Sequence, residues 1–163
     1  MNPPTISGNT ARSAAGGQAL TVQSLMPAAA TLYEQHFWTS SPSQEFQTPS
    51  ILETANDRLI IEDKSELLDV RYLTVLQSSD ANVAADPATA IHSIAGTDFD
   101  GWVGNTAVVF PTTLGQAFSS TTYTVPSTIT RHMVTGSTPG APYTVGVAAN
   151  GGTTTVTLPL VAG

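Results

Sequence analysis

The chain of 163 residues contains no cysteine and carries 5 basic against 12 acidic residues, a formal net charge of -7 at pH 7. The lack of cysteine excludes a disulfide scaffold, a zinc–cysteine site and a thiol nucleophile. The few basic residues are scattered and form no patch for a phosphate backbone, which argues against nucleic-acid binding, and no apolar run is long enough to span a bilayer.

Only 10% of the residues are charged, so hydroxyl and amide groups must keep the protein in solution. Threonine is abundant, and its branched Cβ favours strands over helix interiors. Few lysines together with much threonine, serine, glycine and proline are typical of exported bacterial β proteins. We therefore expect a secreted or periplasmic, acidic protein.

Residues 1–17 are rich in Pro, Ser, Ala and Gly, which predicts a flexible N-terminal arm or linker with at most one short strand over residues 5–7. Residues 18–163 are expected to form one β-sandwich domain. Alternating apolar and polar residues predict strands over 19–25 and 31–38, followed by a loop over 39–50. A short apolar run at 59–61 lies in a charged segment, residues 57–71.

Residues 71–77 are apolar on both faces, which predicts a central strand covered on both sides. A loop follows over 78–87, and further strands are expected over 90–94, over 101–110 on either side of Gly104-Asn105, over 121–125 and over 129–135. The strands 143–148 and 153–158 flank Asn150-Gly151-Gly152, the clearest hairpin signal in the chain. About ten short strands with turns every 8–12 residues predict an all-β, antiparallel β-sandwich.

Four phrases, in order, carry a resemblance to a known family. They are VQSLMPAAATL (22–32), RYLTVLQSSD (71–80), GWVGNTAVVF (101–110) and YTVPSTITRHMVTGSTPGAPYTV (123–145). Together they resemble the C-terminal β region of bacterial heparinase II/III-like polysaccharide lyases. In that family an α/α toroid supplies the tyrosine and histidine that act as base and acid. The present chain has no helical half, so we carry over no catalytic residue.

The resemblance implies a noncatalytic accessory module that has a structural or carbohydrate-associated role and is not an enzyme on its own. Its partners would be a polysaccharide or an adjacent catalytic domain. Trp38, beside the polar loop, and Trp102, after an Asp-Gly pair, are the candidate carbohydrate-binding residues, because sugar rings stack on exposed aromatic faces. The alternative for both is burial in the core, which is what we expect of the four tyrosines. The net negative charge favours a neutral glycan over an anionic one.

Asp98 and Asp100 in TDFDGW are a candidate calcium site, since Ca²⁺ takes oxygen ligands from loops, and the alternative is a simple turn. The histidines His36, His92 and His132 lack the spacing of metal ligands. We expect no cofactor other than this calcium ion.

Two further functions remain open. One is a self-assembling surface or filament subunit, in which residues 1–17 or the apolar C-terminus would be donated as a strand to another copy. The other is a small hydrolase using an acid pair from the charged segment 57–71, whose simpler interpretation is a solvated edge strand.

Overall fold

The computed structural model describes residues 3–36, 57–68, 70–113, 115 and 119–159, and within these residues the protein is all-β, with no helix. The chain contacts divide it into two compact units, Met1–Ala85 and Asp86–Gly163. Because the described residues hold no helix, none is long and apolar enough to cross a membrane. The strands are β1 (Thr5–Ser7), β2 (Thr10–Ala15), β3 (Gln18–Met26), β4 (Thr31–His36), β5 (Asp57–Glu62), β6 (Leu73–Asp80), β7 (Thr89–Gly96), β8 (Phe99–Val103), β9 (Ala107–Pro111), β10 (Ser120–Pro126), β11 (His132–Val134), β12 (Gly146–Asn150) and β13 (Thr153–Pro159).

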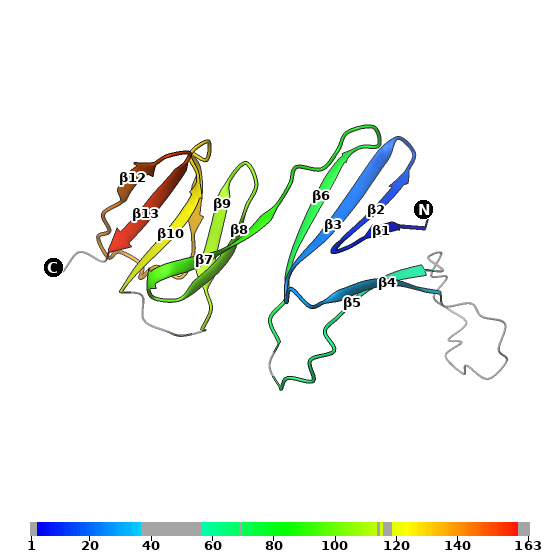
Figure 1. Ribbon diagram of the computed structural model, residues 1–163, viewed down its shortest axis with the longest axis horizontal. Helices are drawn as coiled ribbons and strands as arrows, with labels where there is room; N and C mark the ends of the chain where they lie inside the picture. Colours follow the sequence, from blue (N-terminus) through cyan, green and yellow to red (C-terminus); the bar gives the residue numbers. More distant parts are fainter. Residues whose placement is uncertain (1–2, 37–56, 69, 114, 116–118, 160–163) are drawn as a thin grey trace. The chain divides into compact units, whose positions relative to one another are not determined.

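The first unit contains an antiparallel sheet in the order β1-β2-β3-β6, and a separate ribbon made of β4 and β5 (Figure 1). In place of the expected arm, residues 5–15 form two strands of this sheet. Gly8 turns the chain between them with a φ of 56°, and Ala11 on β2 is buried. The small residues that suggest a linker in sequence are here part of paired strands. The expected single domain over 18–163 is likewise replaced by two units.

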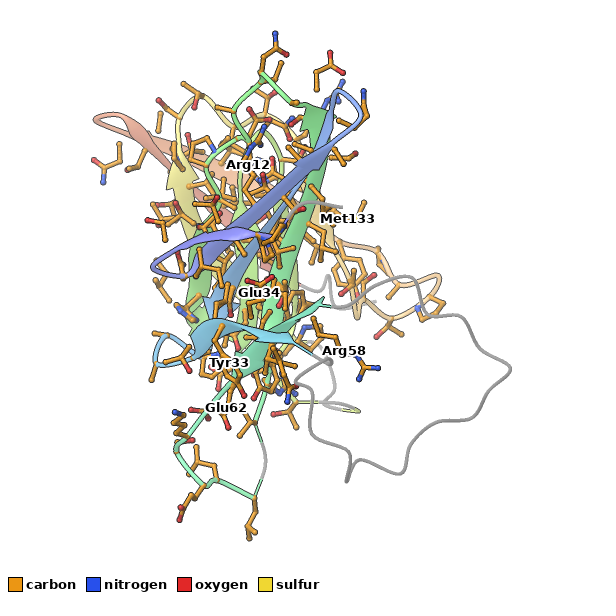
Figure 2. The ribbon with its side chains drawn as sticks, turned by 90° about the vertical axis from the view of Figure 1, so that its right-hand side faces the viewer. Arg12, Tyr33, Glu34, Arg58, Glu62 and Met133 are labelled. Atoms are coloured by element: carbon orange, nitrogen blue, oxygen red, sulfur yellow. The ribbon has the colours of Figure 1, made fainter. Side chains whose placement is uncertain are left out.

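Arg12 connects β2 to the segment that follows β6 through hydrogen bonds. Its Nη1 donates to Thr21 Oγ1 at 3.0 Å, and its Nη2 donates to the carbonyl oxygens of Ala81 and Val83 at 2.9 and 3.0 Å. Figure 2 labels Arg12 on this sheet. One guanidinium therefore satisfies backbone carbonyls that lie about seventy residues away in sequence.

The position of β6 differs from the sequence-based expectation of a doubly covered central strand. It lies at one end of its sheet, where Leu73 and Val75 are buried but Leu76 is 64% exposed. A strand with apolar residues on both faces is buried only where other elements cover both faces. The sequence of the strand does not show whether such elements are present. Tyr72 and Tyr33, the latter labelled on β4 in Figure 2, are also exposed rather than part of a core.

The second unit is a small sandwich whose two sheets share β7. The strand order is β11-β9-β8-β7-β10-β13-β12. Residues 89–92 of β7 pair with β8, whereas residues from Ser93 onward pair with β10, so the strand passes from one sheet to the other. All pairs are antiparallel except that of β11 with β9, which is parallel.

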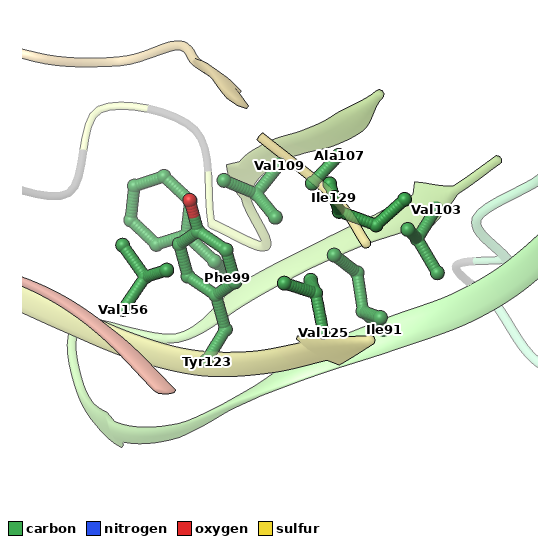
Figure 3. Close-up of a cluster of buried hydrophobic side chains, with 9 residues drawn as sticks. All are labelled: Ile91, Phe99, Val103, Ala107, Val109, Tyr123, Val125, Ile129 and Val156. Carbon is green, nitrogen blue, oxygen red and sulfur yellow. The ribbon is translucent and has the colours of Figure 1, made fainter. Parts of the chain in front are cut away.

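The core of the second unit lies between these two sheets (Figure 3). Tyr123 is its largest fully buried side chain, as the sequence predicts for a tyrosine, and its hydroxyl hydrogen-bonds His132 Nδ1 at 3.0 Å. Burial raises the pKa of the Tyr123 hydroxyl to about 12. The buried members of the core are Ile91, Phe99, Val103, Ala107, Val109, Tyr123, Val125, Ile129 and Val156.

Candidate functional site

An aromatic and apolar surface covers the outer side of the sheet β7-β8-β9-β11. Phe99 and Val103 of β8 belong to the buried core. Alternation along the strand therefore places Asp100, which is also buried, and Trp102, which is half-buried, on the opposite side of the sheet. The ladder places Trp102 between Ala90 of β7 and Val108 of β9, and Met133 of β11 extends this row. A second row, one pleat away, contains His92, Asp100 and Phe110. We call this surface the Trp102 face: Ala90, His92, Asp100, Trp102, Val108, Phe110 and Met133.

Trp102 is half-buried on this face, so its ring is neither fully exposed nor a member of the core of the second unit. Its indole lies against Gly104: a Cβ placed on that glycine would be 2.9 Å from Trp102 Cζ3. Residue 104 therefore has no room for a side chain while the ring keeps this position. The Trp102 ring thus occupies the space that a side chain at residue 104 would need.

His92 and Asp100 form a hydrogen-bonded pair across the β7–β8 ladder, eight residues apart in sequence. His92 Nδ1 donates to Asp100 Oδ1 at 2.5 Å. The Asp100 side chain is 11% exposed, whereas that of His92 is 61% exposed. The pair therefore places an imidazole at the surface, with its orientation set by a buried carboxylate.

The two aspartates proposed as calcium ligands lie within and just before the start of β8. Asp100 is a strand residue bonded to His92, not a loop residue. The carbonyl oxygen of Asp98 accepts hydrogen bonds from the amide and hydroxyl of Thr112, both at 3.0 Å, which ties the start of β8 to the end of β9. In the part of the chain that the structure describes, no three His, Asp or Glu side chains gather as a metal-binding group.

Of the residues proposed for sugar binding, only Trp102 can be placed. Trp38 lies outside the described residues. Sequence reasoning missed His92, Phe110 and Met133 as its neighbours on one surface. The alternation of GWVGNTAVVF predicts which residues of β8 and β9 share a face, but not that β7 and β11 complete it.

The Trp102 face offers groups that can recognise a ligand by stacking and hydrogen bonding. An imidazole held by a carboxylate is part of a nucleophilic triad, which also needs a hydroxyl within reach of the imidazole. Ser93 follows His92 directly but points to the opposite side of the strand, where its Oγ accepts a hydrogen bond from the Phe99 amide at 2.9 Å. A half-buried indole ring and an exposed imidazole can stack on and hydrogen-bond a neutral polyol.

No protein-family model, curated protein or solved structure matches this chain.

Proposed function

We propose that the chain is a noncatalytic accessory module of an extracellular polysaccharide-lyase-like protein, and that it holds carbohydrate on the Trp102 face. The observation that carries this proposal is the outward row of Trp102, Val108 and Met133 beside the polar pair His92–Asp100. Four strands at about 4.8 Å spacing give a surface roughly 14 Å wide, enough for two or three sugar rings. The resemblance of four sequence phrases to lyase β regions points to the same role.

The ligand that fits this face best is a neutral glycan. From Gly101 to the end of the sequence, Arg131 is the only charged residue, so the second unit offers no basic groove for an anionic polymer. Sugar C–H groups would stack on the Trp102 indole, and the imidazole of His92 would hydrogen-bond hydroxyls. A sheet surface of this width suits an extended chain rather than a single sugar.

Affinity electrophoresis through gels containing soluble glycans tests this function. Neutral β-linked polysaccharides should retard the wild-type protein, and Trp102→Ala should weaken binding at least tenfold, about 1.4 kcal/mol. Tyr33→Ala, which removes an exposed aromatic ring from the first unit, is the matched control and should bind like the wild type. If no glycan retards the wild type, the binding role fails and only a structural role remains.

Gly104→Ala offers a subtler variant of the same test. Gly104 is not in the left-handed region, so alanine costs little backbone energy, but its Cβ must displace the indole ring. We expect the dissociation constant for the glycan to be several-fold higher and the melting temperature of the protein to be unchanged. Equal affinity in this variant would show that the position of the ring is unimportant for binding.

A lyase assay on the wild-type protein that follows the absorbance of unsaturated products should give no turnover.

A further inference from the structure

Strand β12 is an edge strand without the usual protection against pairing with another chain. It is the last strand in the order β11-β9-β8-β7-β10-β13-β12, so it pairs on one side only, and every one of its residues is exposed. Natural edge strands are kept from pairing by charges, proline, bulges or short length. Residues 146–150 of β12, GVAAN, contain no charge and no proline, and their pairing with β13 is regular.

The other sheet ends in the described residues carry such protection. β1 has three residues and follows Pro3-Pro4, and β11 has three residues and follows Arg131. β6 ends in Asp80, and the β4–β5 ribbon contains Glu34, Arg58 and Glu62. Among the described sheet ends, β12 is therefore the one longer than three residues that holds no charged residue.

Two apolar side chains at this edge are exposed, and one of them shares its side of the sheet with a core residue. Val147 is paired with Val156, which is 2% exposed, yet Val147 itself is 66% exposed. Val145, just before the strand, is 62% exposed. An additional strand beside β12 would cover part of this apolar surface.

The distribution of charge is compatible with a second copy of the chain as the occupant. All 12 acidic residues lie at or before Asp100, and no charged residue follows Arg131. Two β12 strands can therefore pair without like charges facing each other within the strands. A charged partner strand would find no complementary group on β12.

The backbone geometry also fits self-pairing. The hairpin β12–β13 closes through two residues, Gly151 and Gly152, so hydrogen-bonded pairs alternate from Asn150–Thr153 onward. This alternation directs the N–H and C=O groups of Val147 and Ala149 away from β13. In an antiparallel pair centred on Ala148, Val147 of each copy would face Ala149 of the other, which forms four backbone hydrogen bonds around two small alanines.

We propose that the protein forms a two-fold symmetric homodimer in which the β12 strands of two copies pair antiparallel and join their sheets. The contact is isologous and closes at two copies. It uses a folded edge rather than donation of residues 1–17, most of which already lie in β1 and β2. The proposal is independent of the glycan-binding role.

Sedimentation velocity on the full chain, at concentrations up to about 200 µM, tests the dimer. At that concentration, a dimer with an association free energy of roughly −5 kcal/mol is substantially populated. Ala149→Pro removes an outward N–H without breaking a bond to β13, and Ala148→Lys places two like charges opposite each other. Both should raise the dissociation constant of the dimer at least tenfold. Ala149→Ser keeps the N–H, and Asn105→Lys adds the same charge on the β8–β9 turn; both controls should dimerise like the wild type.

Amide hydrogen exchange gives a second measurement that does not depend on variants folding. The amides of Val147 and Ala149 should become protected as protein concentration rises. A wild type that stays monomeric at all concentrations would overturn the proposal, as would a polymer larger than two or an Ala149→Pro variant that dimerises normally. Variants that no longer dimerise should still be retarded on glycan gels. This result shows that the glycan site is intact without the dimer, so failure of one proposal can be told from failure of the other.

Discussion

At the scale of single residues, the second unit relies on polar groups that are buried and paired. Tyr123 is fully buried, but its hydroxyl reaches His132 at 3.0 Å, and Asp100 reaches His92 at 2.5 Å. Both histidines are exposed, so each pair links an interior oxygen to the surface. A buried polar group without such a partner would cost about 1–3 kcal/mol.

The buried hydroxyl of Tyr123 leads to a prediction about alkaline pH. The folded protein keeps this proton up to about pH 12, whereas the unfolded chain releases it near pH 10, the ordinary pKa. Between these values the unfolded state binds fewer protons, so stability is complete below pH 10 and falls as pH rises toward 12. Thermal melts from pH 9 to 12 should show this loss, and Tyr123→Phe should reduce it. An equal slope in both proteins would contradict the assignment.

At the scale of elements, glycines in two strands illustrate how strand pairing decides whether a position has room for a side chain. A Cβ on Gly101 of β8 would lie 1.9 Å from the carbonyl oxygen of Val108, a backbone atom that cannot move without breaking the sheet. A Cβ on Gly146 of β12 would come no closer than 3.7 Å to Thr157. Neither glycine has a positive φ.

We therefore expect opposite results from two alanine substitutions in strands. Gly101→Ala should destabilise the second unit by about 3 kcal/mol or more, because the added methyl group overpacks the space between β8 and β9. Gly146→Ala should be neutral or stabilise by about 0.5 kcal/mol, because alanine restricts the unfolded chain. Urea denaturation of both variants checks the pair, and a Gly101→Ala variant as stable as the wild type would refute the close approach of these strands.

At the scale of the whole molecule, the chain consists of two compact units with different chemistry. The first unit carries most of the charge, and the second has an uncharged threonine-rich sheet in which Thr122 bonds Thr157 and Thr124 bonds Thr155 at 3.2 and 3.3 Å. The second unit also has its own core, formed only by residues after Asp86. These features indicate that it can fold without the first unit.

Expression of residues 86–163 alone tests this independence. The fragment should give a β-type circular-dichroism spectrum and a cooperative thermal transition, because its core and strand pairs are complete. Gly101→Ala in the fragment should lower its melting temperature as in the full chain. A fragment that lacks a cooperative transition would show that the first unit is required for folding.

The sequence by itself determined that the protein is all-β and where most strands lie, because alternation and turn residues act locally. The two strands at Gly104-Asn105 and the hairpin at Asn150-Gly151-Gly152 are confirmed. Tertiary structure alone decided which strands are neighbours: that 5–15 belongs to a sheet, that β6 is an edge and that β11 runs parallel to β9. Those pairings bring His92 to Asp100 and Met133 to the row of Trp102. They depend on contacts between residues distant in sequence, and local patterning carries no information about such contacts.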